Sequence, residues 1–169
     1  RNKILFSTLA GKDTSYEERL GEIAGFKVLK SAVIYGANGS GKSNFVDAIS
    51  FVKNLVLNSI NFQPGQGIMQ HPHKLDGYDK ESTYQLHFVT GGIRYVFGFS
   101  LKDMLVKEEY LYYFPNGRQT KIFYRLGEEF TTGSKFRGKF ERCKDVLKPN
   151  RLMLSCVANF SNVDEVGKV

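Results

Sequence analysis

Hydrophobic and polar residues follow three patterns along this chain of 169 residues. A compact apolar run at residues 31–35 ends at Gly36, as a buried parallel strand does where it meets a loop. In residues 43–58 the apolar positions recur every three or four residues and polar residues occupy the other side, which predicts an amphipathic helix. From Tyr84 to Phe130 the period changes to two, so this region is expected to form strands.

Two turn signals divide the alternating region. Gly91-Gly92 separates the first two runs, and Asn116-Gly117 follows Pro115 and offers the positive backbone angles of a tight hairpin turn. We therefore expect an antiparallel β meander, with a break in the alternation at Glu108. The aromatic side chains of these strands are predicted to form a β core because they alternate strictly, and stacking on single-stranded nucleic acid is the alternative. They are Tyr95, Phe97, Phe99, Tyr110, Tyr112 and Tyr113.

The chain is expected to form one domain, or most of one, in the mixed α/β class. It begins at Arg1 without a methionine, so we treat it as an excerpt of a longer protein. The expected sections within residues 1–169 are a strand, loop and helix at 31–58, a long loop at 59–82, an antiparallel β subdomain at 83–130, and a basic connector with a final apolar element at 131–169. That last apolar run, Leu152 to Val157, fits a strand or the start of a helix.

Positive charge is concentrated late in the chain. The net charge is +7, from 24 basic and 17 acidic residues, and the section 115–151 is strongly basic. Such a surface attracts nucleic acid through the release of counterions, although a solvated basic face is the more common meaning of a charge run. The basic residues of this section are Arg118, Lys121, Arg125, Lys135, Arg137, Lys139, Arg142, Lys144, Lys148 and Arg151.

The sequence also indicates the cellular compartment of the protein. No segment approaches the length of an apolar membrane span, and the start of the chain lacks the pattern of a secretory signal, so we expect no membrane association and a cytoplasmic protein. Two cysteines, Cys143 and Cys156, are too few for a disulfide framework and lie in no metal-binding pattern, in agreement with a reducing compartment.

One motif carries chemistry. The run from Gly36 to Ser43 satisfies G-x-x-x-x-G-K-[ST] and lies between the predicted strand and the predicted helix. This context directs loop N–H groups and a helix N-terminus at a polyphosphate. Lys42 would then reach the β- and γ-phosphates of ATP, and the Ser43 hydroxyl would bind Mg²⁺. The alternative is a glycine-rich turn with an incidental Lys-Ser pair.

The sequence of this loop resembles the phosphate loop of ABC-type ATPase heads such as SMC, double-strand-break repair and RecF-like proteins. The resemblance includes Asn38 inside the loop and Asn44 after it. The run from Leu29 to Asn44 further resembles the RloA-like ATP-binding proteins of abortive-infection loci. Softer similarity continues through 51–59, 73–76, 93–99 and 108–112. The expected phosphate-binding residues are Gly36, Ala37, Asn38, Gly39, Ser40, Gly41, Lys42, Ser43 and Asn44.

The resemblance also implies parts that are not recognisable here. An ATPase head of this kind has a helical arm, a signature loop and a Walker B strand that ends in Asp-Glu. Asp164-Glu165 is the one Asp-Glu pair, and the residues before it do not form an apolar strand. We therefore expect the N-terminal half of a head, with its catalytic residues unknown.

By the same resemblance, ATP would act as a switch that closes two heads on each other, in antiviral defence together with a nuclease or TOPRIM-like effector. A RecF- or SMC-like ATPase that binds DNA directly is the first alternative, which the basic section favours slightly. A non-catalytic nucleotide-binding module that uses ATP to set an assembly is the second.

Other candidate sites are weaker. His71 and His73 flank a proline in the long loop without a third metal ligand nearby. Cys143 has the basic neighbours Arg142 and Lys144, which would lower its pKa, but no histidine or resolving cysteine supports nucleophilic chemistry.

Overall fold

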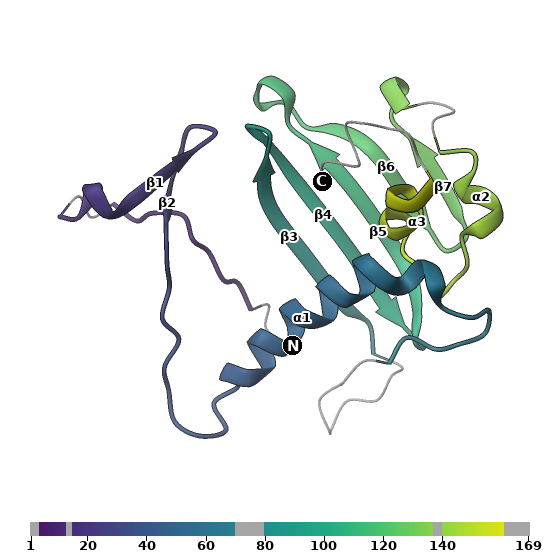
Figure 1. Ribbon diagram of the computed structural model, residues 1–169, viewed down its shortest axis with the longest axis horizontal. Helices are drawn as coiled ribbons and strands as arrows, with labels where there is room; N and C mark the ends of the chain where they lie inside the picture. Colours follow the sequence, from purple (N-terminus) through teal and green to yellow (C-terminus); the bar gives the residue numbers. More distant parts are fainter. Residues whose placement is uncertain (1–3, 13–14, 70–79, 137–139, 161–169) are drawn as a thin grey trace. The chain divides into compact units, whose positions relative to one another are not determined.

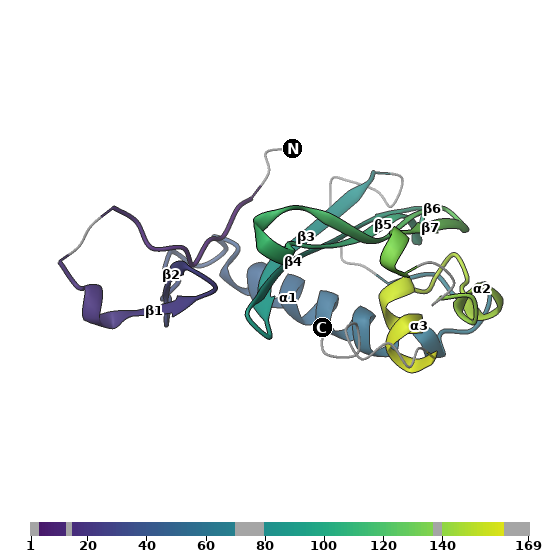
Figure 2. The ribbon, with the colours of Figure 1, turned by 90° about the horizontal axis from the view of Figure 1, so that it is seen from above.

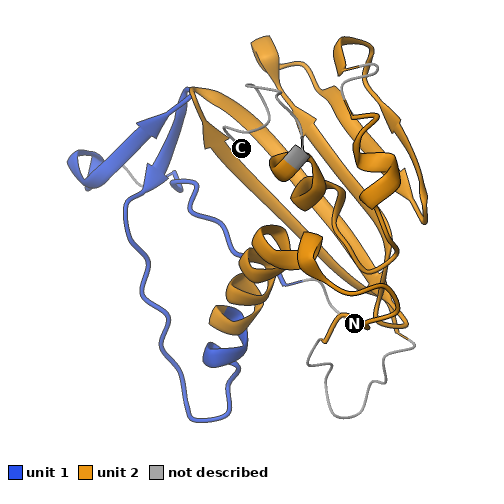
Figure 3. Cartoon of the chain, turned by 45° about the vertical axis from the view of Figure 1, so that its right-hand side comes forward, with its two compact units in different colours: residues 1–45 blue, residues 46–169 orange. Residues whose placement is uncertain are grey.

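The computed structural model describes residues 4–12, 15–69, 80–136 and 140–160. The histidines His71 and His73 and the Asp164-Glu165 pair lie outside these ranges. The chain divides into two compact units, residues 1–45 and residues 46–169 (Figure 3). Each unit is described by itself below.

The first unit contains a short 3₁₀ helix and a β hairpin. Its elements are η1 (Glu17–Arg19), β1 (Leu20–Ile23) and β2 (Phe26–Leu29). The hairpin turn consists of Ala24 and Gly25, both with positive φ angles, 50° and 78°, as the two-residue turns that match strand twist require. Leu9 adds one bridge to Val28, so the extended segment near the N-terminus lies along β2.

The prediction of a buried strand at residues 31–35 is wrong. These residues have no regular secondary structure, and the side chains of Val33 and Tyr35 are 84% and 89% exposed. Among the described strands, β1 and β2 pair with each other and none pairs with this run. A parallel strand depends on neighbours that satisfy its backbone groups and bury both its faces, so apolar composition alone does not form one.

The predicted amphipathic helix is confirmed as α1 (Lys42–Asn58), which begins in the first unit and ends in the second. A 3₁₀ turn, η2 (Ser59–Asn61), follows it directly. Val52 and Leu55 are the buried residues of α1, whereas Ile49, another apolar residue of the 43–58 pattern, is 52% exposed.

The second unit is built on a five-stranded sheet (Figure 1). The predicted antiparallel meander is confirmed, because every strand pairs with its neighbours in sequence. The turn signal at Gly91 and Gly92 is confirmed as a tight hairpin turn, in which both residues have positive φ angles. Asn116 and Gly117 also have the expected positive φ angles, but they lie in a longer connection and not in a tight turn. The strands are β3 (Ser82–Thr90), β4 (Ile93–Lys102), β5 (Leu105–Tyr113), β6 (Thr120–Leu126) and β7 (Glu129–Thr132), and η3 (Pro115–Gly117) joins β5 to β6.

An irregularity in β5 explains the break that the sequence shows at Glu108. Leu101 pairs with Val106 but Ser100 pairs with Glu108, so Lys107 is an extra residue on β5. A shift of one residue moves every following side chain to the other face of the sheet. Glu109 therefore points into the core.

Helices cover one face of this sheet (Figure 2). Three lie on that side, namely α1, α2 (Cys143–Val146) and α3 (Met153–Phe160), and η4 (Ser134–Phe136) precedes α2. Phe51 of α1 packs on Tyr84 of β3, with ring centroids 5.4 Å apart, and Tyr84 stacks on Phe99 of β4. The last apolar run is thus a helix, whose Met153 and Val157 are fully buried.

The core prediction for the aromatic residues is confirmed in part. Tyr95, Phe97 and Phe99 are buried under the helices. Tyr113 also faces the core, where its ring lies nearly perpendicular to that of Phe136, with centroids 5.7 Å apart. Tyr110 and Tyr112 lie on the opposite face, because they follow the extra residue in β5. None of the helices in the described parts of the chain has the length and apolar character needed to span a bilayer.

Candidate nucleotide-binding site

The glycine-rich loop belongs to the first unit and leads directly into the first turn of α1. The N–H of Ser40 donates to the carbonyl of Ala37 at 3.2 Å, which closes a turn inside the loop. The N–H of Phe45 donates to the carbonyl of Gly41 at 3.2 Å and is an early bond of the helix. The motif therefore forms a turn followed at once by a helix N-terminus.

Glycine occurs at three positions of the loop for different physical reasons. Gly39 and Gly41 have φ angles of 79° and 92°, which L-residues with a side chain rarely adopt. A methyl group at Gly36 would lie 2.8 Å from the hydroxyl oxygen of Ser40, so this hydroxyl would have to move. The loop conformation thus depends on glycine mainly at Gly39 and Gly41.

Lys42 folds back over the start of the loop. Its ammonium Nζ donates to the carbonyl oxygens of Gly36 and Ala37, both at 2.8 Å. An ammonium group carries three N–H donors, so these two bonds leave one donor for another acceptor. The arrangement closes the loop into a ring and holds a positive charge beside it.

The start of α1 adds a second positive contribution. The first N–H groups of a helix lack partners within the helix, and the aligned peptide dipoles place partial positive charge at this end. The first turn of α1 contains no acidic residue to neutralise it. Ser43 and Asn44 are exposed in this turn. Loop, ammonium and helix end together make a site suited to an anion such as a polyphosphate.

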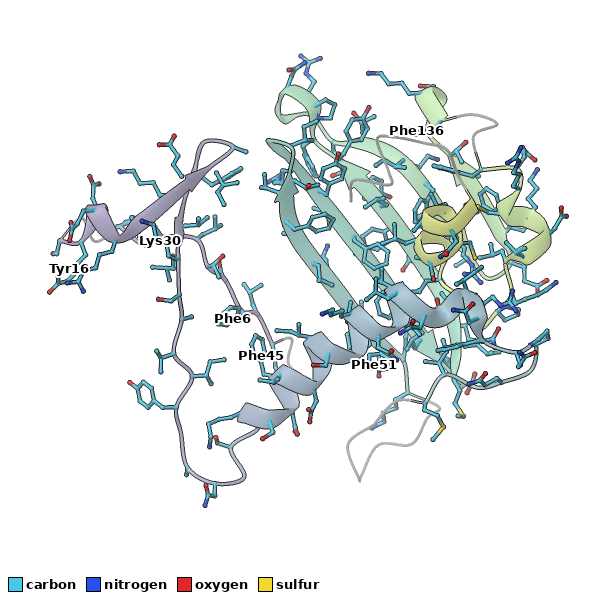
Figure 4. All side chains as sticks on the ribbon, in the orientation of Figure 1. Phe6, Tyr16, Lys30, Phe45, Phe51 and Phe136 are labelled. Atoms are coloured by element: carbon cyan, nitrogen blue, oxygen red, sulfur yellow. The ribbon has the colours of Figure 1, made fainter. Side chains whose placement is uncertain are left out.

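Phe6 packs against the same turn of α1, with its ring centroid 4.8 Å from that of Phe45 (Figure 4). This contact within the first unit joins the extended N-terminal segment to the residue two positions after Ser43. The Phe6–Phe45 contact helps to fix the start of α1, which directly follows the glycine-rich loop.

A metal ion at this loop would be held mainly by the oxygens of a bound nucleotide and by water. The described residues contain no group of three or more His, Cys, Asp or Glu side chains that would hold a metal ion. Proteins usually bind Mg²⁺ through a few protein oxygens together with substrate phosphates and water. The Ser43 hydroxyl fits the role of one such oxygen once phosphates supply others.

A family comparison supports the same chemistry. The model of the family described as "AAA domain, putative AbiEii toxin, Type IV TA system" matches residues 31–143. The chain belongs to this family. The matched part of the AAA domain includes the glycine-rich loop, α1 and the whole β meander. No curated protein and no solved structure matches the chain significantly.

Family membership confirms the coarser part of the sequence interpretation. The chain is a P-loop ATPase-type AAA domain of a family associated with abortive-infection and toxin–antitoxin systems. Its mixed α/β structure with antiparallel sheets is compatible with this class.

The basic section 115–151 does not contribute all its charges to the surface. Arg125 is fully buried and donates to the carbonyls of Gly127 at 2.6 Å and Lys148 at 3.0 Å. Arg151 donates to the carbonyls of Phe62 and Val146. Both guanidinium groups therefore hold the fold together. The exposed members are Arg118, Lys135, Arg142 and Lys144, whereas Arg137 and Lys139 lie outside the described residues.

The expectation that basic neighbours lower the pKa of Cys143 is wrong. The side chain is completely buried, and burial raises the pKa of the Cys143 thiol to about 11. Burial likewise raises the pKa of the Cys156 thiol to about 12. Arg142 and Lys144 are exposed and do not offset this desolvation. Neither thiol is a nucleophile at neutral pH.

One buried carboxylate, Glu109, was not predicted from the sequence, where the break in the alternation at the neighbouring Glu108 was its only signal. Glu109 accepts hydrogen bonds from the backbone N–H groups of Met153 at 2.6 Å and Leu154 at 2.8 Å, the first residues of α3. Burial raises the pKa of Glu109, while Arg125 and the two N–H groups act in the opposite direction. The contacts show a structural role, because they fix the start of α3 against the sheet.

Proposed function

We propose that the chain is part of an ATP-binding and ATP-hydrolysing head of the ABC type, similar to SMC and RecF heads. The observation that carries the proposal is the closed loop from Gly36 to Ser43, with the Lys42 ammonium held beside it and a helix N-terminus behind it. This donor set fits a polyphosphate. When bound, ATP with Mg²⁺ would supply the transferable phosphoryl group.

The residues of the chain would act on ATP by binding and positioning. Lys42 has one N–H donor beyond those bonded to the loop, and this donor would meet a phosphate oxygen. Ser43 would provide the metal ligand. Phosphoryl transfer depends mainly on positioning and charge stabilisation. Hydrolysis would therefore also need a signature loop and a Walker B carboxylate in addition to Lys42 and Ser43.

We further propose that ATP closes this head on a second head, as a dimerising switch in antiphage defence. A nuclease or TOPRIM-like effector would be the output. The association of the family with abortive-infection systems supports this setting. The resemblance of residues 29–44 to RloA-like proteins favours the dimerising head.

The exposed cations Arg118, Arg142 and Lys144 favour one alternative, a RecF- or SMC-like ATPase that binds DNA directly. Charge reversal of these three residues would flatten the salt dependence of DNA binding if they contact phosphates. A non-catalytic nucleotide-binding module is the other alternative, and absence of phosphate release by a nucleotide-binding full-length protein would favour it.

The central test is ATP binding by the full-length protein and its Lys42→Ala variant, measured by titration calorimetry with Mg²⁺. Hydrogen bonds to charged groups contribute about 1.5–3 kcal/mol, so we expect a loss of affinity of roughly tenfold or more. Lys53→Ala is the matched control, because Lys53 is an exposed lysine on the same helix. Equal affinities of the Lys42→Ala variant and the wild type would contradict the assignment.

A further inference from the structure

The face of the five-stranded sheet that lies opposite the helices contains a hollow of about 380 Å³. It belongs entirely to the second unit, and its lining side chains come from β3, β4, β5 and β6 and from the turn between β5 and β6. Three of them are tyrosines, Tyr110, Tyr112 and Tyr124. The volume falls within the lower range of small-ligand sites in proteins.

Strand register shows which residues share this face. Gln85 on β3 pairs with Gly98 on β4, Gly98 pairs with Tyr110 on β5, and Tyr110 pairs with Tyr124 on β6. Directly paired residues of antiparallel strands point to the same side. These residues therefore form one row across the hollow.

Glycine at position 98 shapes the floor. A methyl group there would overlap the ring of Tyr110, so this ring lies across the backbone of β4. The Tyr110 hydroxyl reaches β3, where it is hydrogen-bonded to Gln85. An aromatic ring thus covers the position at which any other residue would place a side chain.

The remaining walls combine flat aromatic surfaces with polar groups. The ring of Tyr112 is tilted by 38° to that of Tyr110, with centroids 5.4 Å apart. The Tyr124 hydroxyl is hydrogen-bonded to the carboxylate of Glu108. The lining thus offers ring faces for stacking, and carboxylate and amide groups that accept or donate hydrogen bonds.

Cations gather toward one end of the hollow. The guanidinium carbon of Arg94 lies 3.7 Å from the ring centroid of Phe114. Lys121 pairs with Tyr112 on the same face, and Arg118 is exposed just before β6. The ammonium of Lys121 is bonded to the Thr131 hydroxyl at 3.0 Å, which keeps it close to the sheet. Glu108 is toward the other end, two residues along β5 from Tyr110.

We propose that this hollow binds an unpaired nucleobase of single-stranded nucleic acid, with the base on the tyrosines and the adjoining phosphates near Arg94, Lys121 and Arg118. Bases stack on aromatic side chains of open sheet faces, and their edges require both donors and acceptors. The cations at one end complement the phosphates of a strand, and the chain as a whole carries a charge of +7. An extended peptide, by contrast, would add to a sheet edge through main-chain bonds.

The proposal does not rest on ATP binding at the glycine-rich loop. The test therefore uses the full-length protein with Lys42→Ala in every arm, so that nucleotide binding at the loop does not contribute. The probe is a fluorescently labelled single strand of twelve nucleotides of mixed sequence, as DNA and as RNA, and binding is measured by anisotropy. We expect Tyr112→Leu and Tyr124→Leu each to weaken binding about tenfold, because a ring face is lost.

The matched control is Tyr16→Leu, which removes an exposed tyrosine of the first unit and is expected to leave affinity unchanged. Circular dichroism of each variant identifies loss of fold. Equal affinity for a duplex of the same sequence would overturn the proposal, as would a mononucleotide that competes as well as the strand, or no binding of either strand.

Photocrosslinking of the bound strand to the protein without tyrosine substitutions gives a second measurement that does not depend on the stability of the variants. We expect adducts at Tyr112, Tyr124 or Phe114. Adducts confined to Lys144 of α2 and to Arg142 just before it would overturn the proposal.

Discussion

Glu109 on β5 and Arg125 on β6 are directly paired residues of the sheet, and both side chains are completely buried. The guanidinium Nη1 lies 3.5 Å from the carboxylate Oε2. The carboxylate also accepts hydrogen bonds from the first N–H groups of α3. The guanidinium donates hydrogen bonds to carbonyl oxygens of the segment that leads into α3. The pair therefore connects the sheet, α3 and the preceding segment in one network.

We expect Glu109→Gln and Arg125→Met each to lower the free energy of unfolding by about 3 kcal/mol, because each leaves the other charge buried and unpaired. The double variant should cost less than the sum of the two single variants, since it removes both charges. Chemical denaturation monitored by circular dichroism measures these values. Glu129→Gln, at an exposed carboxylate on β7, is the control and should change stability by less than about 0.5 kcal/mol. Additive costs would contradict the coupling.

The two buried thiols predict how the free energy of unfolding changes at alkaline pH. The pKa values of Cys143 and Cys156 are raised from 9.0 to about 11 and about 12, so the folded state keeps both thiols neutral. Their contribution to stability is fully present below about pH 9 and is lost as the pH rises through 11 to 12. The free energy of unfolding of the wild type should fall over this range more steeply than that of the Cys143→Ala, Cys156→Ala double variant.

Thiol titration with a coloured disulfide reagent gives an independent measurement. At pH 8 the folded protein should react slowly, because reaction requires an exposed thiolate. The denatured protein should react at once at both cysteines. Rapid reaction of the folded protein would show that at least one thiol is accessible.

The effect of a glycine-to-alanine substitution on ATP binding is expected to depend on its position in the first unit. Gly41 has a φ angle of 92°, so Gly41→Ala should distort the entry to α1 and weaken ATP binding by roughly tenfold or more. Gly11→Ala is the control in the same unit, because its added methyl group has open space and its φ angle is not in the positive region. Titration calorimetry of the full-length variants makes the comparison, and equal affinities would mean that the loop tolerates another conformation.

The sequence predicts those structural elements that are determined by residues close together along the chain. The spacing of apolar residues in 43–58 is sufficient for α1, and the glycines at 91 and 92 are sufficient for the first hairpin of the meander. The conformation of the glycine-rich loop also follows from local residues, because the motif supplies glycines at the positions with positive φ angles and a lysine that reaches back to the loop carbonyls. These features do not depend on what packs against them.

Nonlocal partners decide the features that the sequence did not predict. The apolar run at 31–35 is not a strand, since no described strand lies beside it. The faces of Glu109 and Tyr110 depend on which residue of β5 is extra, and alternation alone does not locate that residue. Arg125 has the same sequence signature as the exposed cations near it. The carbonyls that surround it and the carboxylate of Glu109 distinguish it from a surface residue.

The close approach of Gly98 and Tyr110 gives the last prediction. Gly98→Ala forces the Tyr110 ring away from the strand, so we expect it to lower the free energy of unfolding by about 1–3 kcal/mol. In a Tyr110→Ala background the same substitution should be neutral or stabilising by about 0.5–1 kcal/mol, because alanine restricts the unfolded backbone more than glycine does. The measurement is a double-mutant cycle by chemical denaturation, with a coupling energy of at least about 1 kcal/mol expected. Equal costs in both backgrounds would show that backbone conformation, and not the tyrosine ring, requires glycine at this position.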